Sequence, residues 1–414
     1  MAQVSKETPD GSQDGSSGGA PPTPGTPQAP AVPPPARHNL PLKTAPIVGR
    51  KAEMQAIAGA FERARAQGRA GRVEVVGRPG IGATAVAVEL ARRAGARFAG
   101  GAWFLDVAMG PDLAWAEVAA ARGRGRTKNL PATVRDEKER FAQGPQTVFV
   151  LDGVTSGDQL LAAMPLESRT PPFVFVVCEK KTGITDDVVE VSDVPPHGAR
   201  HICEAMLQGA PPGTQIPAVR TLDGLGLTAS ISARTAMALQ GRAGPLLVED
   251  LKNAALRIVP LVAQNSACLE LLLIASVMHP SRMAVDALFS AIGAVRKGRG
   301  ADPTPEEIGQ AVLTLARAGL LDPQDDRRVS MHPLVQELVR GMAKGEEDLK
   351  VARESAAEGL CEEAEAAMEG DEGVEIATCG LHQLRHLEPQ LEGAIRDRVH
   401  AVRGKLEAAL GAVA

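Results

Sequence analysis

The amino-acid sequence predicts an α/β domain with a parallel sheet, followed by a helical domain, a winged helix and a short helical tail. Apolar runs typical of buried strands alternate with helical segments over residues 39–195, which favours a parallel sheet covered on both faces. A glycine-rich loop follows the first of these strands. Residues 196–262 show only helical patterns, whereas residues 263–345 combine three helices with a hairpin.

Hydrophobic spacing defines the elements of the α/β domain. Apolar residues at helical spacing predict four helical segments: Glu53–Arg65, Thr84–Ala94, Asp112–Ala121 and a short helix containing Leu160–Met164. Short apolar runs predict four buried strands, Val73–Val76, Ala102–Val107, Thr147–Leu151 and Phe173–Val177. Asp152 directly follows the third strand.

The winged helix is predicted from helices that precede a short hairpin. The helices are Leu269–Met278, Met283–Ile292 and Ile308–Ala318, and a further helix, Pro333–Met342, follows the hairpin. Strands beginning at Gly319 and Arg328 flank a turn at Asp325 and Asp326. The tail, residues 346–414, carries an apolar stripe of Leu381, Leu384, Leu387, Leu391, Ile395, Val402 and Leu406. This stripe caps the winged helix or docks a partner protein.

The N-terminal arm, residues 1–38, has nine prolines, many glycines and serines, and no Leu, Ile or Phe. Such a composition buries too little apolar area to offset the entropy of ordering, so we expect a disordered arm. It serves as a tether or as a polyproline ligand.

Overall composition excludes several classes of protein. The net charge of −5 creates no positive field for nucleic acid or anionic lipid. The five cysteines form no Cys-x-x-Cys pair, which argues against a zinc site and a disulfide framework and indicates buried, reduced thiols in a cytoplasm. The chain shows no apolar run of membrane-spanning length and no signal peptide.

The glycine-rich loop has the frame of a P-loop, in which backbone N–H groups and a helix N-terminus bind phosphates. Its residues are Gly77, Arg78, Pro79, Gly80, Ile81, Gly82, Ala83 and Thr84. The pattern requires Lys where Ala83 stands. Thr84 and Asp152 are the expected Mg²⁺ ligands, and Asp152 is a remnant of the catalytic acid motif because Gly153 follows it.

The missing lysine should weaken nucleotide binding without necessarily abolishing it. A charge pair ~4 Å apart contributes about 4 kcal/mol at an effective dielectric constant of 20, and desolvation offsets part of this. We expect a loss of about 2–3 kcal/mol in binding, and a larger loss in hydrolysis, where transition-state charge develops. Arg78 is the one cation within the loop that would substitute for the lysine.

Five segments resemble, in order and spacing, the STAND class of signalling P-loop NTPases with an NB-ARC-like arrangement. They are Ile47–Glu53, the glycine loop, the strand that precedes Asp152, Ala243–Leu246 and Met331–Leu334. The resemblance covers residues 40–345 and implies binding of ADP or ATP with Mg²⁺. It also implies that Val48, Gly49 and Arg50 pack on adenine, that Pro245 lies near the nucleotide, and that His332 reaches the β-phosphate of ADP.

The departures from this family occur where catalysis takes place. Ala83 replaces the lysine, Gly153 replaces a polar residue, and Cys178 and Glu179 replace a sensor arginine. The chain resembles an inactive bacterial member, and such members are components of conflict systems. The leading hypothesis is a regulator or scaffold with weak or absent NTPase activity that couples to other proteins, with oligomerisation left open.

Two alternatives remain at this point. One is an active ATP-hydrolysing switch. The other is a winged-helix transcription regulator, which the charge balance disfavours because residues 263–345 contain nine Lys and Arg against nine Asp and Glu.

Overall fold

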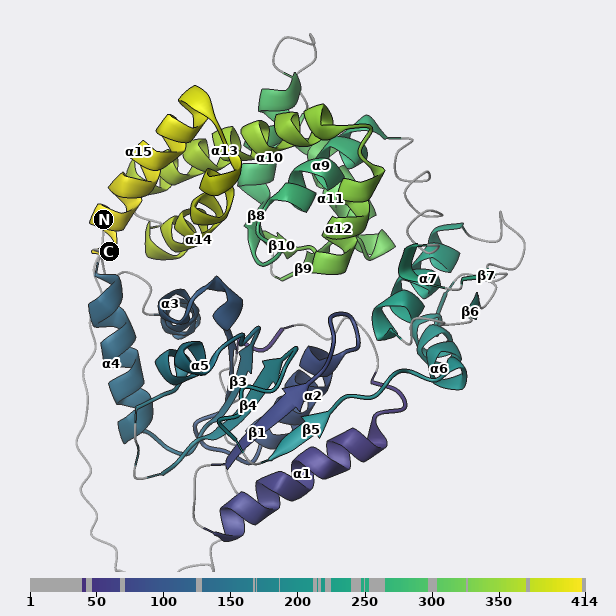
Figure 1. Cartoon of the computed structure of the whole chain (residues 1–414), viewed down its shortest axis with the longest axis vertical. Helices are drawn as coiled ribbons and strands as arrows, with labels where there is room; N and C mark the ends of the chain where they lie inside the picture. The colour runs from purple at the N-terminus through teal and green to yellow at the C-terminus, as the bar shows by residue number, and fades with distance from the viewer. Residues whose placement is uncertain are drawn as a thin grey trace, which may run out of the picture. The chain divides into compact units, whose positions relative to one another are not determined.

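The computed structural model describes most of the chain between Asn39 and Gly411 (Figure 1). The described residues are 39–41, 47–67, 71–123, 129–166, 168, 170–185, 187–210, 214, 217–219, 225–239, 247–248, 250–252, 265–296, 304–324, 327–369 and 373–411. The predicted arm at residues 1–38, the segment Ala243–Leu246 with Pro245, and the turn at Asp325 and Asp326 lie outside these residues.

A five-stranded parallel sheet forms the first part of the fold. Its strands are β1 (Gly71–Val76), β2 (Ala102–Asp106), β3 (Val148–Asp152), β4 (Phe173–Cys178) and β5 (Val188–Glu190), in the order β2-β3-β4-β1-β5. The four strands expected from apolar runs are confirmed. The fifth was not predicted, because its three residues are partly exposed and include an acid.

Helices cover both faces of this sheet, as the alternation of elements predicts (Figure 1). Successive residues of β3 point to opposite faces, so that Val150 joins one apolar core and Phe149 the other. One core contains residues of α1 (Lys51–Ala66) and α2 (Ala83–Gly95). The other contains residues of α3 (Pro111–Ala121), α4 (Leu130–Gln143) and α5 (Gly157–Ala163), which include Trp115 and Phe141. The sequence analysis did not predict α4.

A smaller part follows the sheet. The helices α6 (Pro196–Met206) and α7 (Gly226–Leu239) pack through small buried residues that include Ala199, Ala229 and Ala233. Two short strands, β6 (Ala218–Val219) and β7 (Leu247–Val248), pair in parallel. The expectation of only helical patterns in residues 196–262 is therefore wrong at these four residues.

The next part contains four helices and a small antiparallel sheet. The helices are α9 (Ser266–Val277), α10 (Val285–Arg296), α11 (Pro305–Ala318) and α12 (Pro333–Met342). The strands β8 (Met283–Ala284), β9 (Asp322–Pro323) and β10 (Arg328–Ser330) pair in the order β8-β10-β9. The predicted hairpin corresponds to β9 and β10. Met283 and Ala284 were expected in a helix, and they form a third strand because they pair with β10.

Three helices form the tail: α13 (Glu346–Glu369), α14 (Gly373–Leu387) and α15 (Gly393–Ala409). Helix α13 packs on α10 and α9, whereas α14 contacts α3 of the sheet part. At Gly359 the backbones of α13 and α10 approach so closely that a Cβ atom would lie 2.4 Å from the Ala287 carbonyl oxygen. The predicted leucine stripe is buried within the chain, with Ile395 packed against it, and so provides no free docking face.

No described helix has the length and apolarity needed to cross a membrane. All five cysteines lie within the described residues; they are buried and free, as predicted.

Candidate functional site

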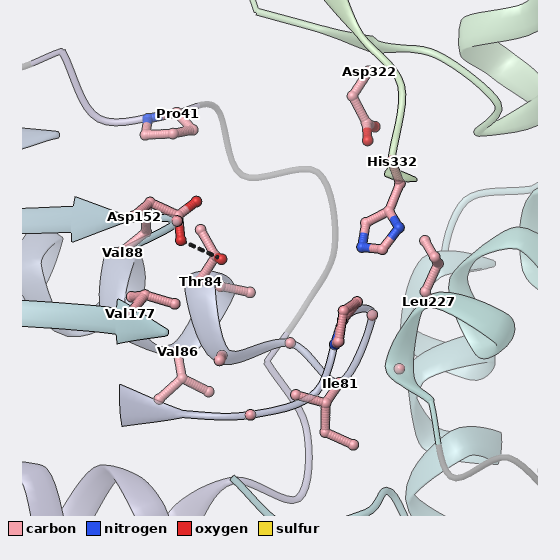
Figure 2. Close-up of a pocket in the computed structure, with 18 of the residues that line it drawn as sticks. Pro41, Ile81, Thr84, Val86, Val88, Asp152, Val177, Leu227, Asp322 and His332 are labelled. Carbon is pink, nitrogen blue, oxygen red and sulfur yellow. Dashed lines mark hydrogen bonds between the residues drawn. The ribbon is translucent and has the colours of Figure 1, made fainter. Parts of the chain in front are cut away.

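A cavity of about 520 Å³ opens at the carboxyl edge of the parallel sheet (Figure 2). Its floor is the P-loop, residues 77–84, and the ends of β2, β3 and β4 form one wall. The other walls come from distant segments, which contribute Val48, Leu227, Ser281 and His332. Parallel strands place their carboxyl ends at one edge, which explains why the loop after β1 and Asp152 at the end of β3 meet here.

The P-loop follows β1 and leads directly into α2. Gly80 and Gly82 adopt left-handed backbone angles, φ 78° and 102°, which glycine adopts without a steric penalty. A Cβ atom at Gly77 would lie 2.6 Å from Cγ2 of Ile81, so the tight turn also requires glycine there. The N-cap residue of α2 is Gly82, which has no side chain that could cap this helix. The N–H groups of the first turn of α2 therefore face no capping group from Gly82 and can bind an anion in the cavity.

Two hydrogen bonds hold the P-loop backbone from outside the loop. The Leu227 N–H donates to the Gly80 carbonyl oxygen at 3.1 Å. The Nη2 atom of Arg50 donates to the Ile81 carbonyl oxygen at 2.8 Å. The loop is thus fixed by α7 on one side and by the residue that precedes α1 on the other.

Arg50 supports the loop and does not present a free guanidinium to a ligand. Its side chain is buried, pairs with Glu53 at 3.1 Å and also donates to the Ser192 carbonyl oxygen. Val48 and Arg50 line the cavity, as the adenine-site expectation requires, but Gly49 is not among the lining residues. In addition to the contact with adenine that the sequence predicts, Arg50 positions the P-loop through its hydrogen bond to Ile81.

Three arginines line the cavity that contains Ala83. Ala83 is buried at the first position of α2, in the cavity wall. Each lining arginine already pairs with a carboxylate: Arg50 with Glu53, Arg78 with Asp193 at 2.8 Å, and Arg92 with Glu89 at 3.3 Å. Arg78, the candidate substitute, is about half exposed in this pair.

Asp152 and Thr84 are brought together as expected for a pair that orients Mg²⁺. The Thr84 hydroxyl donates to the Asp152 carboxylate at 2.9 Å (Figure 2). Burial raises the pKa of Asp152 to about 7, and the negative charge of Asp106 adds to the shift. A bound cation would reverse this shift by stabilising the carboxylate.

Asp106 is a cavity residue that the sequence analysis missed. It is the last residue of β2 and lies opposite Asp152 in the register of the two strands. Burial raises its pKa, whereas a hydrogen bond from Ser281 and the charge of Arg282 act in the opposite direction. Its position beside Asp152 depends on β2 and β3 being neighbours in the sheet, which no local motif reveals.

The oxygen atoms of Thr84, Asp152 and Asp106 fit a hard divalent cation such as Mg²⁺. Among the described residues, no group of three or more His, Cys, Asp or Glu side chains is arranged to hold a metal. Mg²⁺ in such sites usually takes one or two carboxylates together with phosphate oxygens and water. This donor set therefore suits a cation that arrives with a phosphorylated ligand.

His332 lies across the cavity from Thr84 and Asp152 (Figure 2). It precedes α12, and its Nδ1 atom accepts a hydrogen bond from the Leu334 N–H at 3.2 Å. Burial lowers its pKa to about 4, so the ring is neutral at pH 7. Since Nδ1 accepts a hydrogen bond, the single ring proton resides on Nε2, which is then a donor for a ligand oxygen.

Comparisons with known proteins support the fold. No family model and no curated protein matches the chain. A Signal Transduction ATPase with Numerous Domains (STAND) protein with a tetratricopeptide repeat sensor, from Pyrococcus horikoshii, matches with a TM-score of 0.53 and 13% identity, over 92% of this chain and 54% of that one. This chain thus spans about half the length of that structure.

Two further solved structures are similar at lower scores. The ORC1 protein from Aeropyrum pernix in complex with DNA matches with a TM-score of 0.41 and 14% identity, over 72% of this chain and 93% of that one. Cdc6p from Pyrobaculum aerophilum matches with a TM-score of 0.38 and 14% identity, over 76% of this chain and 97% of that one. The parallel sheet, its glycine loop and the likeness to the STAND protein together show that the chain has a P-loop NTPase fold.

Proposed function

We propose that the chain is a catalytically degenerate nucleotide-switch module of the STAND type. It binds ADP or ATP with Mg²⁺, hydrolyses ATP poorly or not at all, and acts as a regulator or scaffold for other proteins in a bacterial signalling or defence system. Thr84 and Asp152 hold the Mg²⁺, the P-loop N–H groups bind the phosphates, and His332 contacts the ligand from the opposite wall.

One observation supports this proposal: the cavity combines a glycine loop at a helix N-terminus with the Thr84–Asp152 pair, and Ala83 lines it at the position of the family's lysine. The loop geometry and the hydrogen bond between Thr84 and Asp152 are intact, yet Ala83 stands where the lysine belongs and every lining arginine already pairs with a carboxylate. Glu179 lines the cavity near the position expected for a sensor arginine. Hydrolysis requires positive charge where the transition state becomes more negative. The loss of cations therefore reduces the rate of hydrolysis more than the affinity for the nucleotide.

Restoring the lysine tests the site directly. The Ala83→Lys variant should bind ADP at least tenfold more tightly than the wild-type chain, because the ammonium regains the lost attraction for the phosphates. Ala83→Met is the matched control, since it adds similar length without charge and should give no gain. Isothermal titration calorimetry with Mg²⁺ and ADP measures the affinity of each variant for ADP. Equal affinities for the Lys variant and the wild type would contradict a phosphate site.

The nucleotide content of the purified chain gives a second test. The chain is purified without added nucleotide and denatured, and the supernatant is analysed by ion exchange. Near-stoichiometric ADP would support a locked, nucleotide-bound switch. Steady Mg²⁺-dependent ATP turnover that disappears in Asp152→Ala would instead establish the active ATP-hydrolysing switch, which the intact contact between Thr84 and Asp152 keeps as the second candidate.

A further inference from the structure

Helix α7 begins at the P-loop and presents one of its faces to the cavity. The Leu227 N–H, in its first turn, donates to the Gly80 carbonyl oxygen at 3.1 Å. A Cβ atom at Gly80 would lie 3.4 Å from the Leu227 Cβ atom, so this turn packs directly against the loop. Leu227 and Ser230 both line the cavity. Since residues three apart share one face of a helix, Ser230 lies one turn beyond the contact with the P-loop.

The Ser230 hydroxyl differs from two other hydroxyl groups of the same helix. Serine and threonine inside helices can donate to the carbonyl oxygen four residues earlier. Ser232 donates in this way to Thr228 at 2.6 Å, and Thr235 donates to Ile231 at 2.8 Å. Ser230 is half-buried, and no hydrogen bond within the described part of the chain involves its hydroxyl. This hydroxyl is therefore available to a ligand in the cavity.

The apolar end of the cavity lies beside the same part of α7. Val48, Val194 and Ile202 line the cavity and pack in one cluster with Ala229 of α7. Apolar lining of this kind suits the faces of a nucleobase, whereas the N–H groups of the P-loop suit phosphates. Ser230 directly follows Ala229 in the helix. Its hydroxyl thus belongs to a residue that adjoins the apolar end of the cavity.

Ser230 consequently connects the two ends of the cavity. It is one turn from Leu227, which binds the P-loop, and it is next to Ala229, which packs on the apolar end. In a nucleotide the ribose joins the phosphates to the base, so a nucleotide that spans both ends places its sugar between them. A serine hydroxyl can both donate and accept a hydrogen bond, and so can the hydroxyl groups of ribose.

We propose that Ser230 binds a hydroxyl group of the ribose and makes the site selective for ribonucleotides over nucleotides whose sugar lacks hydroxyl groups. This inference rests on the proposed function, because that function supplies the nucleotide. It adds a sugar-binding residue on α7 to the phosphate-binding loop.

The affinities for ADP and 2′,3′-dideoxy-ADP test the ribose contact. The two ligands differ only in the ribose hydroxyl groups, and isothermal titration calorimetry with Mg²⁺ measures both. The wild-type chain should bind ADP about three- to tenfold more tightly, which is the contribution of one typical hydrogen bond. The Ser230→Ala variant should bind ADP more weakly by the same factor and should bind dideoxy-ADP as the wild type does. The two changes remove the same contact, so their effects should not add.

Ser232→Ala is the matched control for this comparison. It removes a hydroxyl from the same helix, but that hydroxyl donates to the helix backbone. Both affinities should therefore stay at their wild-type values. Alanine favours a helix interior more than serine does, so Ser230→Ala should fold at least as stably as the wild type, and thermal denaturation checks this. Titration of 2′-deoxy-ADP and 3′-deoxy-ADP then identifies which ribose hydroxyl binds Ser230.

Two results would overturn the ribose contact and leave the proposed function intact. The first is equal affinity of the wild-type chain for ADP and dideoxy-ADP. The second is an equal loss of affinity for both ligands in Ser230→Ala, which would show that the hydroxyl contacts the phosphates or only supports the helix. A parallel loss of affinity for inorganic pyrophosphate would identify the phosphate contact. If the wild-type chain binds neither nucleotide, the proposed function itself is refuted, and the ribose contact with it.

Discussion

At the scale of single residues, Arg50 makes a structural contact that its sequence motif does not reveal. The motif predicts contact with adenine, and in the structure the guanidinium is also buried against Glu53 and two backbone carbonyl groups. Removing one partner of a buried ion pair leaves the other charge desolvated and costs about 3–5 kcal/mol. Arg50 therefore contributes to the site through the stability of the loop.

Arg50→Ala should accordingly lower the free energy of unfolding by about 3–5 kcal/mol. The double variant Arg50→Met with Glu53→Leu should recover part of this loss, because no buried charge remains unpaired. The control is Arg63→Ala, which breaks an ion pair whose arginine is 60% exposed and should cost less than about 1 kcal/mol. Urea denaturation measures the free energy of unfolding of the three variants. Similar losses in Arg50→Ala and Arg63→Ala would contradict the role of Arg50 in stabilising the P-loop.

At the scale of elements, the close approach of α13 and α10 depends on Gly359. Alanine normally favours a helix interior over glycine by about 1 kcal/mol. Here the added Cβ would lie 2.4 Å from a backbone oxygen and 2.6 Å from the Ala291 nitrogen, so the helices must separate. We expect Gly359→Ala to destabilise the chain by about 1–3 kcal/mol.

The matched control is Gly404→Ala in α15, where an added Cβ atom would meet nothing within 4 Å. This variant should leave stability unchanged or raise it by up to about 1 kcal/mol. A lower Tm for Gly359→Ala together with an unchanged or higher Tm for Gly404→Ala would confirm that packing, not helix propensity, determines the effect at Gly359. A gain in stability at both positions would contradict the described contact between α13 and α10.

Local sequence patterns predicted the elements that are marked by a continuous apolar run, a clear helical spacing or a short motif. The central strands are continuous apolar runs, and the glycine loop and Asp152 follow from short motifs. Helix α4 was missed because a run of charged residues, 135–140, occupies its middle and only a few residues, such as Leu130 and Phe141, are buried. Strand β8 has two residues and exists only because β10 pairs with it. The position of Asp106 beside Asp152 depends on the pairing of β2 with β3, which a single sequence does not encode locally.

At the scale of the whole molecule, buried histidines link α14 to the segment after α9. The ring centroids of His279 and His382 lie 4.0 Å apart, and those of His279 and His386 lie 5.3 Å apart. Burial and the neighbouring histidines lower the pKa of His279 to about 3, and burial, His386 and Arg385 lower that of His382 to about 4. The folded chain keeps these rings neutral, whereas the unfolded chain protonates them near pH 6.5.

The contribution of these histidines to stability should therefore fall as the pH decreases below about 6.5, whereas Asp152 and Glu363, whose pKa values burial raises to about 7, act in the opposite direction. In this range the histidines bind more protons in the unfolded state, and each removes up to about 1.4 kcal/mol per pH unit. Above pH 6.5 their contribution is fully present. The His382→Gln variant should show a shallower loss between pH 6.5 and 4.5 than the wild type, whereas the exposed His197→Gln should not. Parallel pH profiles for all three chains would contradict neutral, buried rings.

The two hydrogen bonds that hold the P-loop have a consequence for binding entropy. Ordering one residue of backbone costs about 1–2 kcal/mol, and a flexible loop would bear that cost when a ligand arrives. Here Leu227 and Arg50 donate hydrogen bonds to the carbonyl oxygens of Gly80 and Ile81 from outside the loop. The saving for two residues is about 2–4 kcal/mol, which is comparable to the attraction lost with the lysine. Under the proposed function, preorganisation of the loop offsets part of the attraction for phosphate that is lost with the lysine.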